Sequence, residues 1–173
     1  MQKIKWASYK EGNILDWADK VDVIGHQVNC FGVMGGGLAL QIATKWPNVE
    51  YEYQEYIIRH IHISRTDLLG HCHIAIPKSA GRCSIANLFG QYDVGGGLRT
   101  DYEALQKALR ELKGTMRKYN QTKLALPVNL GCGLAGGNWN TVQDIIENVF
   151  ENSQIELTLV SYIQNNYSKK VTL

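Results

Sequence analysis

His26 and Asn29 are two polar residues that could do chemistry at the end of an apolar run, residues 21–28, and just before three consecutive glycines. The glycines are Gly35, Gly36 and Gly37. An imidazole has an ordinary pKa of about 6.5, so His26 could move a proton near neutral pH. A glycine loop that opens a helix presents free backbone N–H groups to an anion, because no Cβ atoms stand in the way. A phosphate-binding loop beside a proton carrier is therefore one interpretation, and a flexible strand-to-helix turn is the other.

Two common phosphate-binding motifs do not fit this loop. A P-loop needs Gly-Lys followed by Ser or Thr, whereas Gly37 is followed by Leu38 and Ala39. The dinucleotide fingerprint needs a further glycine at the position of Leu40, and no acidic residue follows at a suitable distance to bind a ribose. A less common type of diphosphate site is needed.

Two more glycine loops occur where a strand gives way to a helix. Residues 91–97 follow an expected strand at 83–90, and residues 131–137 follow another at 124–130. In an open α/β sheet such junctions lie at the carboxyl edge, where ligands bind. Three glycine loops at one edge indicate a binding site more strongly than any one of them.

The remaining pattern alternates strands with helices and predicts an α/β fold with a mainly parallel sheet. Further strands are expected at 3–10, 70–77 and 155–163, and helices at 38–46, 48–62, 100–119 and from Asn138 or Asn140 to 150. Asp16 is expected to cap a short turn, and Thr100, Asp101 or both to cap the long helix. We expect one domain over residues 1–164 and a polar tail over 165–173.

Composition excludes several classes of function. With 18 basic and 16 acidic residues the formal charge is +2, which does not suggest a nucleic-acid surface. No apolar run is long enough to span a membrane, and the first residues lack a secretory signal. The four cysteines have no CxxC spacing, so we expect reduced thiols in a cytoplasmic monomer.

Four histidines, His60, His62, His71 and His73, form two HxH pairs. No carboxylate or cysteine at ligand spacing accompanies them, so we expect no metal and no cofactor.

Four separated motifs together resemble the macrodomain family, and the match covers nearly the whole chain. They are residues 11–14 (EGNI), 26–29 (HQVN), 35–37 (GGG) and 131–134 (GCGL). The resemblance implies a three-layer α/β/α fold with a mixed, mainly parallel sheet, and ADP-ribose or a derivative as ligand. The branch it resembles contains an ADP-ribose-1''-phosphate phosphatase and a terminal ADP-ribose glycohydrolase.

The resemblance also implies the residues that bind the ligand. Asn13 matches the position of an aspartate that accepts a hydrogen bond from adenine, and an amide oxygen can still accept. Ile14, next to it, is a further ligand-binding candidate. Asn29 matches a position near the distal ribose, and Tyr92 is a candidate to stack on a ring of the ligand. The two diphosphate loops are matched by Gly35, Gly36 and Gly37 and by Gly131, Cys132, Gly133 and Leu134.

The reactive groups of the glycohydrolase branch are missing. Gln91 stands near the place of a lysine, and Ala135 stands in place of an aspartate. His26 matches a histidine of the phosphatase, and a catalytic and a purely structural role for it stay open. Asp93 is a weaker catalytic candidate, and Cys132 is either a helix-terminal thiol of lowered pKa or an inert one.

Two functions from different classes follow. The first is a hydrolase that acts on the distal ribose of ADP-ribose derivatives through His26 and Asn29. A terminal phosphate is the preferred leaving group, and an ester-linked or acetyl group is the next. The second is a module that binds ADP-ribose without turning it over.

Overall fold

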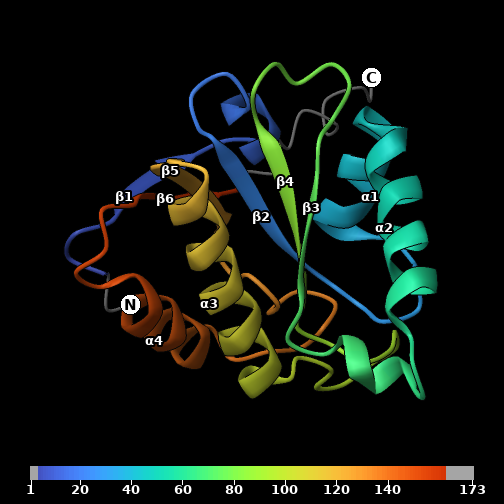
Figure 1. Ribbon diagram of the computed structural model, residues 1–173. Coiled ribbons are helices and arrows are strands. Elements are labelled where there is room, and N and C mark those ends of the chain that lie inside the picture. The colour runs from blue at the N-terminus through green and yellow to red at the C-terminus, as the bar shows by residue number, and fades with distance from the viewer. Residues whose placement is uncertain (1–3, 163–173) are drawn as a thin grey trace, which may run out of the picture.

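The computed structural model describes residues 4–162, which build one six-stranded sheet between two layers of helices (Figure 1). The strand order is β1-β6-β5-β2-β4-β3, and only β3 runs antiparallel to its neighbour. The strands are β1 (Ser8–Glu11), β2 (Val23–Val28), β3 (Cys72–Ala75), β4 (Ser84–Phe89), β5 (Lys123–Pro127) and β6 (Glu156–Ser161). The helices are α1 (Gly37–Lys45), α2 (Pro47–His60), α3 (Tyr102–Lys118) and α4 (Trp139–Phe150). The predicted three-layer, mainly parallel architecture is confirmed.

Each face of the sheet has its own apolar core because side chains alternate along the strands. Val23, Leu88 and Leu124 pack with α3 and α4, while Ile24, Ile85 and Phe89 pack with α1 and α2. Burial on both faces explains why β2, β4 and β5 consist mostly of apolar residues.

Side-chain caps set where two helices begin. The Asp101 side chain accepts from the N–H of Ala104 at the start of α3, and Asn138 accepts from two N–H groups of α4. These residues decide between the alternatives that the sequence left open.

Three local features differ from the prediction. The first strand begins at Ser8 rather than residue 3, because an edge strand is assigned only where it pairs with β6. The short turn after it is a 3-10 helix, η1 (Ile14–Trp17), and Asn13 caps it in place of Asp16. A second 3-10 helix, η2 (Arg65–Leu68), was not predicted; a Ser64–Asp67 capping box starts it. The expected tail, 165–173, lies outside the described residues.

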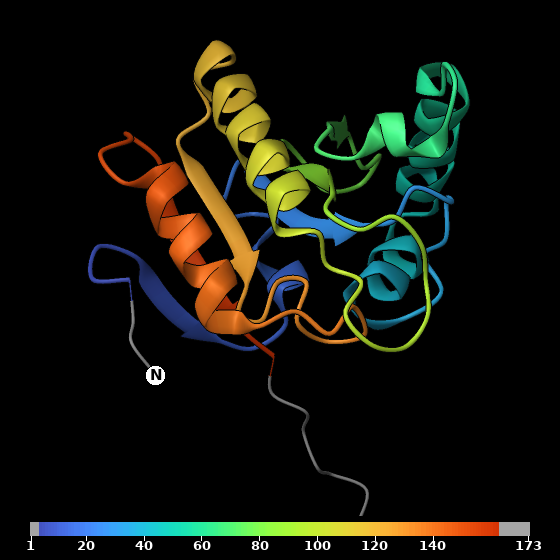
Figure 2. The same cartoon turned by 90° about the horizontal axis from the view of Figure 1, so that it is seen from below.

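The connections from β2 to α1, from β4 to α3 and from β5 to α4 all leave the sheet at one edge. They are called here the first loop (29–36), the second loop (90–101) and the third loop (128–138). Figure 2 shows the second and third loops side by side below the sheet, next to α1. No helix within residues 4–162 has the length and apolarity to cross a membrane.

Candidate active site

A cavity of about 1130 Å³ opens between the three loops at the carboxyl edge of the sheet. It is lined by most of the residues that the sequence singled out, namely Asn13, Ile14, His26, Asn29, Gly35, Gly36, Gly37, Gly131, Gly133 and Leu134. Tyr92 and Cys132 are not among the lining residues. Segments that lie far apart in the sequence are thus brought to one site.

One partly buried amide, that of Gln27 at the end of β2, connects the second loop to the third. Its Nε2 donates to Oε1 of Gln91 at 3.0 Å and to Oγ1 of Thr100 at 2.9 Å. The Thr100 hydroxyl in turn donates to the carbonyl of Gly131 at 2.5 Å. Gln27 packs so closely that a Cβ at Gly131 would lie 2.5 Å from its Oε1.

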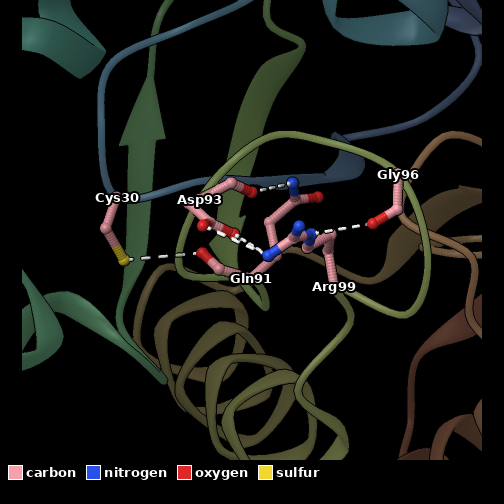
Figure 3. Close-up of polar contacts among 5 residues, drawn as sticks. All are labelled: Cys30, Gln91, Asp93, Gly96 and Arg99. Carbon is pink, nitrogen blue, oxygen red and sulfur yellow. Dashed lines mark hydrogen bonds and ion pairs between the residues drawn. The ribbon is translucent and has the colours of Figure 1, made fainter.

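The second loop is folded by contacts within itself and with its neighbours (Figure 3). Arg99 makes an ion pair with Asp93 at 3.1 Å and donates to the carbonyl of Gly96. The Gln91 amide donates to the Asp93 carbonyl, and the Cys30 thiol contacts the Gln91 carbonyl. The Asp93 carboxylate is therefore bound to Arg99 and does not line the cavity.

The carbonyl of Ala135 accepts from the N–H groups of both Arg99 and Thr100. Ala135 thus joins the third loop to the second through its backbone.

His26 is buried on β2 with 2 % of its surface exposed. Its Nε2 lies 2.6 Å from Oδ1 of Asn87 on β4, whereas its Nδ1 has no partner. Because an amide oxygen only accepts, Nε2 carries the proton and Nδ1 has a free lone pair. Burial lowers the pKa of His26 to about 4, although the Asn87 contact opposes the shift. At neutral pH the ring is an uncharged proton acceptor.

The Asn29 side chain organises the first loop. Its Oδ1 accepts from the N–H groups of Phe31 and Val33, and its Nδ2 donates to the Val33 carbonyl at 2.7 Å. The Tyr53 hydroxyl also reaches Asn29, at its backbone carbonyl and at its Oδ1.

Asn13 lines the same cavity as His26. Its Oδ1 accepts from the N–H of Leu15, and its Nδ2 donates to Gln41 at 3.3 Å. The oxygen expected to meet adenine therefore already caps η1, with one lone pair left for a ligand.

Tyr92 does not line the cavity and packs edge-on against Phe31, with ring centroids 5.2 Å apart. Phe31 in turn lies beneath the Arg65 guanidinium, 4.8 Å from its ring centroid.

Cys132 does not lie at a helix terminus, because α4 begins only at Trp139. Its thiol donates to the Leu130 carbonyl, and burial raises its pKa to about 11. The activated-thiol interpretation is therefore wrong. All four cysteines are free, as predicted.

No Asp, Glu, Lys or Arg among the described residues lines the cavity. Backbone N–H groups and uncharged amides supply its polarity. Two residues that shape the site, Gln27 and Asn87, were missed as candidates. The signal for Asn87 was a single amide side chain in the otherwise small and apolar strand of residues 84–89.

No protein-family model matches the chain. The human ADP-ribose glycohydrolase is 26% identical over 158 residues, which cover 88% of this chain and 89% of that protein. The ADP-ribose 1''-phosphate phosphatase of Candida glabrata is 25% identical over 170 residues, covering 80% and 90%. These names confirm the family resemblance that the motifs indicated.

Solved structures share the fold. The macrodomain of Mycobacterium tuberculosis DarG has a TM-score of 0.75 at 21% identity, covering 89% of this chain and 96% of that one. Thermosipho africanus DarTG, solved in complex with ADP-ribose, has a TM-score of 0.75 at 18% identity, covering 92% of this chain and 43% of that one.

The loop geometry predicts opposite outcomes for two glycines that lie two residues apart. Gly131 has φ +69° and no room for a Cβ, so Gly131→Ala should lower the free energy of unfolding by about 1–3 kcal/mol. Gly133 has nothing within 4 Å of a Cβ, so Gly133→Ala should melt near the parent temperature. Thermal unfolding of both variants tests this, and equal melting temperatures would contradict the described packing around Gln27.

Proposed function

We propose that this chain, a macrodomain by fold, binds ADP-ribose in the cavity and hydrolyses derivatives that carry a substituent on the distal ribose. The observation that carries the proposal is that His26, whose buried and uncharged Nδ1 has no hydrogen-bond partner among the described residues, lines the same cavity as the first and third glycine loops. The names of the relatives, which act on ADP-ribose or its 1''-phosphate, support the substrate class.

The diphosphate would lie between the first and third loops. Gly36 adopts an extended conformation at the N-cap of α1, where free N–H groups and the helix dipole favour an anion. On the other side Gly133 has open space in front of it, so a phosphate oxygen can approach the backbone. Neither loop needs a cationic side chain for this mode of binding.

Nδ1 of His26 would then take a proton from a water that attacks C1'' of the distal ribose, and the bond from C1'' to the oxygen of the substituent would break. With its pKa near 4 it does not supply a proton to the leaving group at neutral pH. The preferred substrates are therefore those whose leaving group departs as an anion, first a terminal phosphate and second an ester-linked carboxylate. Asn29 would hold the first loop beside the distal ribose.

Asn13 and Ile14 would meet the adenine end, and Tyr92 would close the rim. We further propose that the protein works as a cytoplasmic monomer. Its four free thiols and its small net charge support that environment.

A binding module without turnover is the second candidate. It is favoured by the uncharged lining of the cavity, in which Gln91 and Ala135 stand where a related enzyme has reactive side chains. Calorimetry with ADP-ribose beside a turnover assay with the 1''-phosphate and ester derivatives separates the two. Binding with no turnover of any substrate would decide for the module.

The ligand assignment is tested by placing a side chain on each diphosphate loop. Gly36→Val and Gly133→Val should each weaken ADP-ribose binding about tenfold to a hundredfold, because one or two charge-assisted hydrogen bonds of about 1.5–3 kcal/mol are lost. Both should stay folded, since the new Cβ at Gly36 meets only the mobile end of exposed Leu134 and the one at Gly133 meets nothing.

Gly114→Ala, on the exposed face of α3, is the matched control and should bind ADP-ribose like the parent. Unchanged affinity in both folded valine variants would remove the ligand assignment.

The role of His26 is tested by His26→Gln, whose amide can still donate to Asn87. Turnover should fall by about two orders of magnitude or more with ADP-ribose affinity unchanged, because only the proton acceptor is lost. The parent should keep its rate as the pH falls below 6.5 and lose it toward about 4, where His26 is protonated. A variant as fast as the parent would leave His26 a structural role only.

A further inference from the structure

A row of polar side chains crosses the sheet from the cavity to β3, the antiparallel edge strand. His26 on β2, Asn87 on β4 and His73 on β3 are paired at one register, so their side chains share a face of the sheet. Asn87 Oδ1 lies 2.6 Å from Nε2 of His26, and Asn87 Nδ2 lies 3.0 Å from Nδ1 of His73. Asn87 is fully buried.

A single amide in this position fixes the protons of both rings. Its nitrogen donates, so Nδ1 of His73 must be the unprotonated acceptor. Its oxygen accepts, so Nε2 of His26 must carry the proton, which leaves the lone pair of that ring on Nδ1. If the amide turned by 180°, Nε2 of His26 would have to accept and Nδ1 would carry the proton.

Nothing in the contacts of Asn87 with His26 alone prevents that turn, because His26 presents either a donor or an acceptor with equal geometry. With its oxygen toward His26, the Asn87 amide turns its nitrogen to Nδ1 of His73, so this orientation is kept only while that nitrogen is unprotonated and accepts.

We propose that His73 is a positioning residue: through Asn87 it keeps Nδ1 of His26 free to accept a proton. The catalytic consequence of this inference rests on the proposed function, whereas the assignment of the protons does not.

The surroundings of His73 hold its ring in place and uncharged. Tyr56 of α2 stacks on it at 4.6 Å and is itself stacked by His60 at 3.8 Å. The Tyr56 hydroxyl is fixed by Nδ1 of His71 at 3.0 Å.

The charged and titratable groups that affect His73 come from α2. Burial is the main effect and lowers its pKa to about 4, with a raising contribution from Glu52 and a lowering one from His60. His73 is therefore a neutral acceptor at neutral and mildly acidic pH. At lower pH its Nδ1 would be protonated, and the Asn87 amide would have to turn its oxygen toward His73.

The test reads the protons directly by long-range ¹H–¹⁵N NMR of the imidazole rings in the full chain at neutral pH. In the parent, the Nδ1 signals of both His26 and His73 should have the shift of an unprotonated nitrogen. His73→Phe keeps the ring against Tyr56 but removes the acceptor. In that variant the Nδ1 signal of His26 should move toward the shift of a protonated nitrogen.

His71→Phe is the matched control, because His71 contacts Tyr56 but not Asn87; there the His26 signals should stay as in the parent. On the phosphate-bearing substrate, His73→Phe should lose turnover while its affinity for ADP-ribose is unchanged. A protonated Nδ1 of His26 in the parent, or an unchanged His26 in His73→Phe, would overturn the inference. The NMR result stands even if no substrate is turned over, so failure of the proposed function and failure of this inference are distinguishable.

Discussion

The site depends on one partly buried side chain, that of Gln27, whose amide holds the second and third loops against each other. Its two hydrogen bonds to Gln91 and Thr100, and that of Thr100 to Gly131, join segments that are 31 to 73 residues apart. The close packing also dictates sequence. Gly90 and Gly131 have no room for a Cβ because the Gln27 side chain occupies that space. Glycine is needed at this site for two physical reasons. Gly90 and Gly131 leave room for the Gln27 side chain, and in the proposed function Gly36 and Gly133 leave room for the ligand.

A second constraint is the lack of charge around the cavity. In the proposed function a diphosphate is held by backbone N–H groups and a helix terminus, which need not be desolvated like a lysine or an arginine. Two charged side chains of the second loop, Asp93 and Arg99, neutralise each other outside the lining, and the third, Asp101, caps α3. In such surroundings a buried imidazole stays neutral, and its chemistry depends on which nitrogen carries the proton.

Local patterns in the sequence predicted the architecture well. Apolar runs marked β2, β4 and β5, helical spacing marked α3, and the glycine runs marked the loops that surround the cavity. What the sequence did not reveal depends on contacts between distant residues. The roles of Gln27 and Asn87 appear only when β2, β4 and the third loop are side by side. Asn13 rather than Asp16 caps η1, because the backbone at Asn13 is extended just before the turn. The reactive thiol considered for Cys132 failed because α4 begins at Trp139, seven residues after Cys132, so the thiol is not at a helix terminus.

The central claim is that ADP-ribose occupies the cavity with its diphosphate between the first and third loops. A titration of the ¹⁵N-labelled chain with ADP-ribose, followed by amide NMR, tests it most directly. The account predicts that the largest shifts fall on the N–H groups of Gly35, Gly36 and Gly37 and of Gly131, Cys132, Gly133 and Leu134. Amides on the outer face of α3 should not move. Binding with shifts confined to other parts of the chain, or no shifts at saturating ADP-ribose, would contradict the account.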